Sequence, residues 1–275
     1  MDLYQGFAAT RPVAPAPGNH EACGACPAIP GLGENNGKNF TECVSFARGE
    51  PSHSQRSNPP NPKHRAHRRY KARFHSVALN SNTGNSLYYS FNKGLTHFLV
   101  FTAEAYIYAR DESFLANQLA FMKADLAAVD RKATPWVVGL VHKDWTMEAE
   151  AYAAFSPILQ GGKVDVLFVG HVHYYNRYMP FDPVTNDVDT ACVSADGSTY
   201  FNAKYMTTIV TGASGDREDD DKYTKESPSF TGSENYGYGY FTALNATHAT
   251  WAFKTVKADG AGPADYADKL TWIKA

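Results

Sequence analysis

Hydrophobic residues from about residue 85 onward fall into short runs that predict strands alternating with helices. Apolar, β-branched runs at 135–141 and 164–169 are typical of buried parallel strands. A helical stretch, 148–160, lies between them. Strand, helix and strand in this order predict a right-handed crossover that joins neighbouring parallel strands.

Further elements follow from the same patterns. Strand-like segments at 87–91 and 96–102 are joined by Asn92-Lys93-Gly94, which predicts a hairpin in which His97 is packed inside the second strand. Asp111 begins a predicted helix that runs to about Asp130. Strands are also expected at 205–211, 238–244 and 249–256, the last of them in the chain. The expected buried face of the helix comprises Leu115, Leu119, Met122, Leu126 and Val129.

Composition indicates a globular protein with one large α/β domain or two small ones. The 275 residues are 43% hydrophobic and carry a formal net charge of −2, which gives no general attraction to nucleic acid or to an anionic membrane. The longest apolar stretches, such as 98–108, are too short to span a bilayer. Residues 1–5 do not resemble a signal peptide.

Residues 48–76 form a segment of different character. It contains a dense basic run, 63–73, and almost no aliphatic residues. A basic arm for nucleic acid or another polyanion is one interpretation, and sequence that does not belong to the mature protein, such as a retained intron, is another. We favour a disordered, solvated insertion, because the run has no amphipathic pattern and the surrounding chain is mildly acidic. No nucleic-acid or membrane partner is therefore expected.

Cysteines and sequons indicate an oxidising compartment. Cys23 and Cys26 form a single C-x-x-C with no second pair to complete a zinc site, so disulfides are favoured. Asn39 and Asn245 each begin an Asn-x-Thr sequon and are candidate glycosylation sites. We expect a secreted protein, or one of the secretory and vacuolar pathway.

Three histidines follow the two predicted parallel strands. His142 comes directly after the first strand, and His171 and His173 follow the second after Gly170. Because the carboxyl ends of parallel strands lie at one edge of a sheet, these histidines are expected at the same edge, where α/β sheets place their ligands. Imidazoles that converge there predict a metal site.

Several ordered motifs resemble those of the purple acid phosphatases, in the metallophosphoesterase superfamily. The resemblance covers most of the chain outside about 44–82. The segments that carry it are Pro17-Gly-Asn-His-Glu21, Trp136 to Trp145 with Val141-His142-Lys-Asp, Val164-Asp-Val-Leu-Phe-Val-Gly-His-Val-His-Tyr-Tyr-Asn-Arg177, and Tyr238-Gly-Tyr240 with Asn245-Ala-Thr-His248.

The resemblance implies an α/β fold (an α+β sandwich) in which two mixed β-sheets are flanked by helices. The whole chain, 1–275, would be one metallophosphoesterase-like domain, with 200–260 as its C-terminal region. The family hydrolyses phosphate monoesters at a dinuclear centre of Fe with Zn, Mn or Fe. By the match, Asn19, His142 and His171 would bind the divalent ion and His173 the ferric ion. His20 would contact the substrate phosphate and act as a catalytic residue.

The chain also departs from the family pattern. The Asp-x-Gly and Gly-Asp-x-x-Tyr motifs, which supply anionic and bridging ligands upstream of Asn19, do not occur, and Val141 replaces the usual glycine. The sequence is therefore expected to be truncated at its N-terminus, with an incomplete fold there. Two hypotheses stay open: an acid phosphatase, or a non-catalytic fragment that binds one divalent ion or none. The oligomeric state cannot be inferred.

Overall fold

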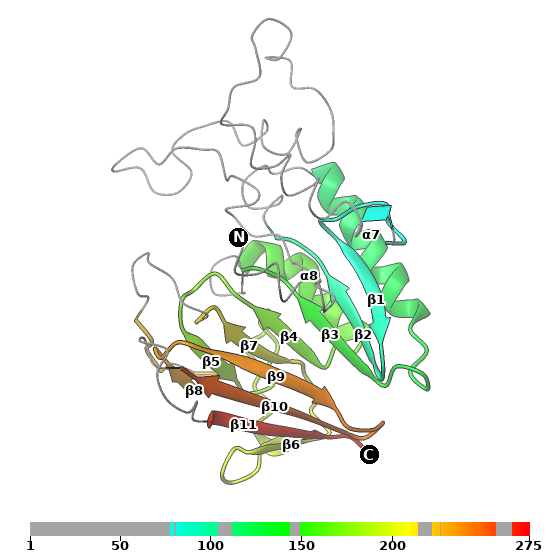
Figure 1. Ribbon diagram of the computed structural model, residues 1–275. Coiled ribbons are helices and arrows are strands. Elements are labelled where there is room, and N and C mark those ends of the chain that lie inside the picture. The colour runs from blue at the N-terminus through cyan, green and yellow to red at the C-terminus, as the bar shows by residue number, and fades with distance from the viewer. Residues whose placement is uncertain are drawn as a thin grey trace, which may run out of the picture.

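The fold is built from two β-sheets that pack face to face. The computed structural model describes residues 78–79, 81–103, 112–143, 149–213, 222–225, 227–256 and 266–275. Within these residues the α7 and α8 helices lie against the outer face of the larger sheet, and the smaller sheet packs on its other face (Figure 1). The expected α/β sandwich of two mixed sheets is thus confirmed.

The larger sheet has seven strands in the order β1-β2-β3-β4-β7-β5-β8. The four central strands, β2, β3, β4 and β7, run parallel, and antiparallel strands flank them on both sides. Its strands are β1 (Tyr89–Lys93), β2 (Thr96–Val100), β3 (Trp136–Leu140), β4 (Val166–Val169), β5 (Tyr175–Tyr178), β7 (Thr207–Thr211) and β8 (Ser229–Ser233).

The predicted crossover is present. The α8 helix (Ala149–Gly161) joins β3 to β4, and these strands pair in parallel with Gly139 opposite Leu167. Gly139 allows close packing there, because a Cβ at this position would lie 2.7 Å from the Leu167 side chain. The β1–β2 hairpin is also confirmed, although its turn is at Gly94-Leu95 rather than at 92–94.

The α7 helix (Glu112–Ala128) buries Met122 and Leu126 as predicted, but the rest of its buried face differs from the prediction. Phe114 and Gln118 are buried, whereas Leu115 and Leu119 are only partly buried. Hydrogen bonds explain why the Gln118 amide is buried. Its oxygen accepts from the Thr102 N–H at 3.0 Å, and its nitrogen donates to the Thr102 carbonyl at 2.8 Å. It thereby pairs with both backbone polar groups of Thr102, just past the end of β2.

His97 is a packed residue, as expected. Its Nδ1 lies 2.7 Å from Asn92 Oδ1 and its Nε2 lies 2.8 Å from Asp125 Oδ2. Ser90 donates to the other oxygen of Asp125. This cluster attaches the hairpin to α7 and is fully engaged in structural contacts.

The smaller sheet has four strands in the order β6-β11-β10-β9, and β6 pairs with β11 in parallel. The expectation that 249–256 is the last strand is wrong, since β11 follows it. The strands are β6 (Thr199–Phe201), β9 (Gly237–Ala243), β10 (His248–Thr255) and β11 (Tyr266–Ile273), and the short 3-10 helix η3 (Thr190–Cys192) precedes β6.

Two apolar cores hold these layers together. One lies between the helices and the larger sheet and contains Met122, Phe155 and Leu167. The other lies between the sheets and is dominated by aromatic rings such as Trp251 and Trp272. Among the described residues no helix has the length and apolar character needed to cross a membrane.

A buried ion pair links the sheets through the second core. Arg177 of β5 donates from Nε and Nη2 to both carboxylate oxygens of Asp268 in β11, at 2.6 and 2.9 Å. Tyr175 donates to Asp268 at 2.5 Å, and Tyr200 accepts from Arg177 Nη1. Burial raises the pKa of Tyr175 well above its ordinary value, and burial raises that of Tyr200 to about 12. Burial disfavours the charged guanidinium, but hydrogen bonding to Asp268 outweighs this and raises the pKa of Arg177.

Several predicted features lie outside the described residues. These are Asn19, His20, Asn39, the three cysteines Cys23, Cys26 and Cys43, and the segment 48–76. The fourth cysteine, Cys192, is a buried free thiol.

Candidate metal centre

His142 and His171 meet at the carboxyl edge of the parallel strands, as predicted. His142 lies two residues past the end of β3, and His171 lies two residues past the end of β4. The Gly170 N–H donates to the His142 carbonyl at 2.9 Å, so the strand pairing continues to the histidines. Tyr152 of α8 donates to the Lys143 carbonyl at 2.8 Å and fixes the chain after His142.

The two imidazoles have the separation expected of ligands that share one ion. His142 Nε2 lies 3.1 Å from His171 Nδ1, and the rings are inclined at 73°. Two nitrogens each about 2.0–2.1 Å from a common zinc-sized ion would lie this far apart at an N–metal–N angle of about 100°. A single proton between the nitrogens also accounts for the contact, so the pair is compatible with both states.

A tight turn brings His171 into this position. His171 has a positive φ of 67°, which non-glycine residues rarely adopt, and the Val172 N–H donates back to the Gly170 carbonyl at 2.9 Å. Gly212, which follows β7, makes room for the turn: a Cβ there would lie 1.9 Å from the Val172 carbonyl oxygen. Backbone strain at a site that presents a side chain to its neighbour indicates a functional constraint.

The described residues do not by themselves complete a metal site. No group of three or more His, Cys, Asp or Glu side chains in the described ranges is arranged to hold an ion. His142 and His171 are thus brought together, while His173 lies two residues further along the turn, partly buried. Asn19 and His20 are outside the described residues, so their predicted places stay predictions.

Tyrosines continue from the histidine turn. The Tyr174 ring contacts the Tyr223 ring edge to face, with the centroids 5.7 Å apart. Tyr223 shares a hydrogen bond of 2.8 Å with Ser229, which in turn donates to Asn176 at 2.7 Å. These contacts connect the residues after the turn to β5 and β8.

Comparison with known families agrees with this arrangement. The family model for calcineurin-like phosphoesterases matches residues 1–175, which is more than half of the chain and includes all three histidines. A second model, described as iron/zinc purple acid phosphatase-like protein C, matches residues 205–264. The chain belongs to the purple acid phosphatases.

Curated purple acid phosphatases are similar to the chain over part of their length. Purple acid phosphatase 18 of Arabidopsis thaliana is 30% identical over 196 residues, which are 67% of this chain and 39% of that protein. An acid phosphatase of Aspergillus ficuum is 25% identical over 264 residues, which are 78% of this chain and 42% of that protein. The chain therefore spans about two fifths of the length of these relatives.

A solved structure shares the fold. The purple acid phosphatase PPD1 from yellow lupin (Lupinus luteus) seeds has a TM-score of 0.53 and 20% sequence identity, and the match covers 69% of this chain and 33% of that one. This likeness concerns the fold alone.

The described residues of this purple acid phosphatase fit one divalent ion better than a ferric ion. Two neutral imidazoles suit borderline ions such as Zn²⁺, whereas a hard ferric ion calls for anionic oxygen ligands. None of the carboxylates in the described ranges joins the histidine pair. The assignment of His142 and His171 to the divalent position, and of His173 to the ferric position, stays a prediction.

Sequence reasoning missed two contacts: the packing of Gly212 against the histidine turn, and the Arg177–Asp268 pair between the sheets. Gly212 lies 42 residues after Gly170 in the sequence. Asp268 lies 91 residues after Arg177. A single sequence offers one weak signal for them, namely a glycine after a buried strand and a charged residue within an otherwise uncharged run. Neither signal identifies the contact that it makes.

Proposed function

We propose that this chain acts as a metal-dependent acid phosphatase that hydrolyses phosphate monoesters. The observation that carries the proposal is the 3.1 Å approach of His142 Nε2 to His171 Nδ1 at the carboxyl edge of the parallel strands. Membership of the purple acid phosphatases supports it, since this family is metal-dependent and acts on phosphate esters.

The proposed centre is dinuclear, with Fe in one position and Zn, Mn or Fe in the other. His142 and His171 would hold the divalent ion together with Asn19, and His173 would contribute to the ferric position. Two cations of this kind supply Lewis-acid chemistry, because they polarise a bound phosphate ester and neutralise its negative charge.

The chain's own residues would position the metal ligands, bind the substrate and transfer a proton. The turn at His171 and the hydrogen bond from the Gly170 N–H to the His142 carbonyl would hold the backbone that carries the two imidazoles in place. His20 would bind the substrate phosphate and deliver a proton to the oxygen of the leaving alcohol, which is general acid catalysis. Protonation of His20 would favour activity at acid pH.

A second candidate function is a non-catalytic chain that binds a single divalent ion. It is favoured by one observation: no third His, Cys, Asp or Glu among the described residues completes a site with the histidine pair. Such a chain would keep the fold and one ion without turnover.

The proposal extends to the secretory or vacuolar pathway with glycosylation at Asn39 and Asn245. Asn245 is exposed in the turn between β9 and β10, where its Oδ1 accepts from the Thr247 N–H at 2.9 Å. An exposed turn is the setting in which glycans are attached.

Metal content and turnover, measured on one sample, distinguish the two functions. Purified chain would be analysed for metals by mass spectrometry and assayed with p-nitrophenyl phosphate at about pH 5, below the ordinary pKa of histidine. Near two ions per chain with turnover supports the phosphatase. One ion without turnover supports the non-catalytic chain, and an ion content that His171→Gly leaves unchanged overturns both. His248→Ala, which alters a histidine of the smaller sheet, is the matched control.

A further inference from the structure

Four strands form the edges of the two sheets: β1 and β8 in the larger sheet, and β6 and β9 in the smaller one. An edge strand presents N–H and C=O groups that can pair with another strand, and proteins protect such edges with charges, prolines or bulges. The β1 strand ends in the exposed Lys93. The β8 strand follows Pro228, and its pairing with β5 is interrupted by an irregularity in register next to Tyr178. Both edges of the larger sheet thus carry protection.

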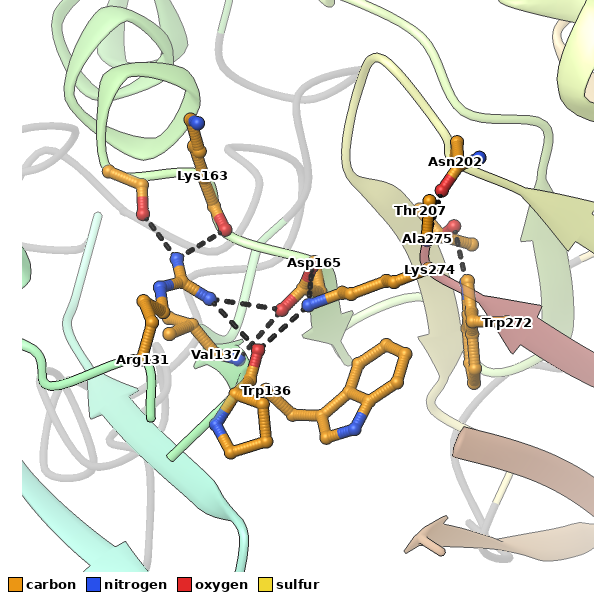
Figure 2. Close-up of polar contacts among 12 residues, drawn as sticks. Arg131, Trp136, Val137, Lys163, Asp165, Asn202, Thr207, Trp272, Lys274 and Ala275 are labelled. Carbon is orange, nitrogen blue, oxygen red and sulfur yellow. Dashed lines mark hydrogen bonds and ion pairs between the residues drawn. The ribbon is translucent and has the colours of Figure 1, made fainter. Parts of the chain in front are cut away.

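The β6 edge of the smaller sheet is closed by nearby segments of the chain. Val193 forms a bridge to Tyr200 on the side of β6 that faces away from β11. Just past the end of β6, the side-chain oxygen of Asn202 accepts from the Ala275 N–H at 2.6 Å (Figure 2). This edge therefore offers no free run of backbone to another strand.

The β9 edge lies on the opposite side of the smaller sheet (Figure 1). Its sequence, Gly-Tyr-Gly-Tyr-Phe-Thr-Ala, contains no charged residue and no proline. Within the described ranges, no strand pairs with β9 on the side away from β10. Tyr240 and Thr242 are exposed, and Gly239, Phe241 and Ala243 are only partly buried, so solvent reaches this edge. The β9 strand is thus the edge that lacks protection.

Hydrogen bonds at both ends of β9 show which of its residues face away from β10. Just before the strand, the Tyr236 carbonyl accepts from the Val256 N–H at 2.8 Å, and just after it, the Leu244 N–H donates to the His248 carbonyl at 2.9 Å. Even-numbered residues therefore bond to β10, and the alternation of an antiparallel pair directs the N–H and C=O groups of odd-numbered residues outward. The outward groups without a partner among the described residues are those of Gly239, Phe241 and Ala243.

One antiparallel register pairs these three residues with the same residues of a second copy. Phe241 of one copy lies opposite Phe241 of the other, and Gly239 of each lies opposite Ala243 of the other. On the outer face, this register places Tyr238 of each copy opposite Leu244 of the other. These two side chains are 42% and 57% exposed, so their contact would remove apolar surface from water.

Neighbouring registers are blocked by bonds that already exist. A shift of two residues in one direction would need the Gly237 N–H, which donates to the Ala213 carbonyl at 2.7 Å. The same shift in the other direction would need the Asn245 N–H, which donates to the His248 carbonyl at 3.2 Å. The register centred on Phe241 is therefore the one that uses only free backbone groups.

We propose that β9 is an interaction surface for β9 of a second copy of this chain, paired antiparallel about a two-fold axis at Phe241. The two smaller sheets would then form one continuous sheet across the axis. A second copy suits this edge because the register is self-complementary and the uncharged strand meets no like charge on its copy. The proposal uses none of the histidines of the candidate metal centre and does not depend on the proposed phosphatase activity.

Sedimentation velocity on the full chain, over a series of protein concentrations, tests the proposal. A pair of short strands buries a small area, so we expect a dimer whose share increases with concentration. Non-reducing gel electrophoresis identifies any dimer that is linked through cysteines, and such a dimer does not count. A chain that stays monomeric at every concentration overturns the proposal.

A matched pair of lysine variants locates the interface. Thr242→Lys places a charge on the outer face of the edge strand, and the two-fold axis brings the same charge of the other copy close to it. It should weaken the dimer by at least about tenfold. Thr250→Lys is the control, because Thr250 lies directly opposite Thr242 on β10, one strand away from the edge. It should dimerise like the parent chain. Equal dimerisation by the two variants, with both folded by circular dichroism, would overturn the assignment to β9.

A proline variant tests the backbone pairing itself. Ala243→Pro removes an outward N–H but no hydrogen bond to β10, and proline is tolerated on an edge strand in this position. Because each copy loses one donor, the dimer should again weaken by at least about tenfold. A folded Ala243→Pro chain that dimerises as tightly as the parent would show that β9 does not pair through its backbone.

Discussion

The two edges of the parallel strands are built in opposite ways. At the carboxyl edge, His142 and His171 face each other with nitrogen atoms 3.1 Å apart, and a left-handed residue holds one of them in place. At the amino edge, Asp165 is bound from several sides: it accepts from the Val137 N–H at 2.8 Å and pairs with Arg131 and Lys274. Main-chain bonds from the same residue reach both β3 and β7.

This difference shows how one sheet separates stability from binding. The amino edge ties three strands and the end of β11 together with charges that satisfy one another. The carboxyl edge instead holds two acceptor-capable rings close together, an arrangement that gains stability only when a proton or a cation lies between them. We therefore expect substitutions at the amino edge to change the free energy of unfolding, and those at the carboxyl edge to change metal affinity.

The largest effect is expected at neither edge but at the buried Arg177–Asp268 pair between the sheets. Arg177→Met leaves the Asp268 carboxylate buried without its cation, which should cost about 3–5 kcal/mol in the free energy of unfolding measured in urea. Combining it with Asp268→Leu should restore part of that loss, since an apolar pair tolerates burial better than a lone charge. If Arg177→Met alone is as stable as the parent chain, the pair does not hold the sheets together.

The second-largest effect is expected at the carboxyl edge, on the affinity for metal. His171→Gly removes one imidazole but suits the positive φ, so the affinity for Zn²⁺ should fall by about 10–100-fold or more while stability changes by no more than about 1 kcal/mol. Competition with a chromophoric chelator measures the affinity, and urea unfolding of the metal-free chain measures the stability. A large loss of stability with unchanged affinity would reverse the roles that we assign to the two edges.

At the amino edge we expect a substitution to lower stability and to leave the affinity for Zn²⁺ unchanged. Asp165→Ala leaves Arg131, Lys274 and the Val137 N–H without their shared acceptor, and should lower the free energy of unfolding by about 2 kcal/mol. The cost is less than for Arg177 because the side chains of both cations are about one third exposed. Asp165→Asn, which can still accept from Val137, should lose less. Zn²⁺ affinity of the folded variants should match that of the parent chain.

The smallest effect is a pH dependence beside the amino edge. Burial, assisted by the nearby Asp189, raises the pKa of the Cys192 thiol from 9.0 to about 12. Because the folded state holds this proton more tightly than the unfolded state, stability is complete below about pH 9 and declines as the pH rises toward 12. The Cys192→Ala variant should not show this loss of stability at high pH. Equal pH slopes for the two chains between pH 9 and 10 would contradict the assignment.

The central strands could be predicted from the sequence because their cause is local. The runs that became β3 and β4 are apolar enough to require burial on both faces, and the helix between them fixes their parallel direction. Convergence of His142 with His171 then follows from topology. The same reasoning could not place Asn19 or His20, since no predicted strand fixes the loop that carries them.

The β5 and β11 strands could not be predicted because their causes are distant in sequence. The β5 strand reads Tyr-Asn-Arg-Tyr and is buried throughout, which is unfavourable for Arg177 unless Asp268 lies beside it. The β11 strand begins with exposed and charged residues, and its apolar alternation is limited to Leu270 and Trp272. Similarly, Gln118 lies on the buried face of α7, where its amide makes two hydrogen bonds to the backbone of Thr102.

Gly212 has a consequence for how members of this family could diverge. Any side chain at this position would meet the Val172 carbonyl oxygen, and the turn that would have to move carries both His171 and His173. One nucleotide change at this codon could therefore silence the centre while every histidine is still encoded. Inheritance of the histidines alone would then be a poor guide to inheritance of the function, and the residue at 212 would be the better marker.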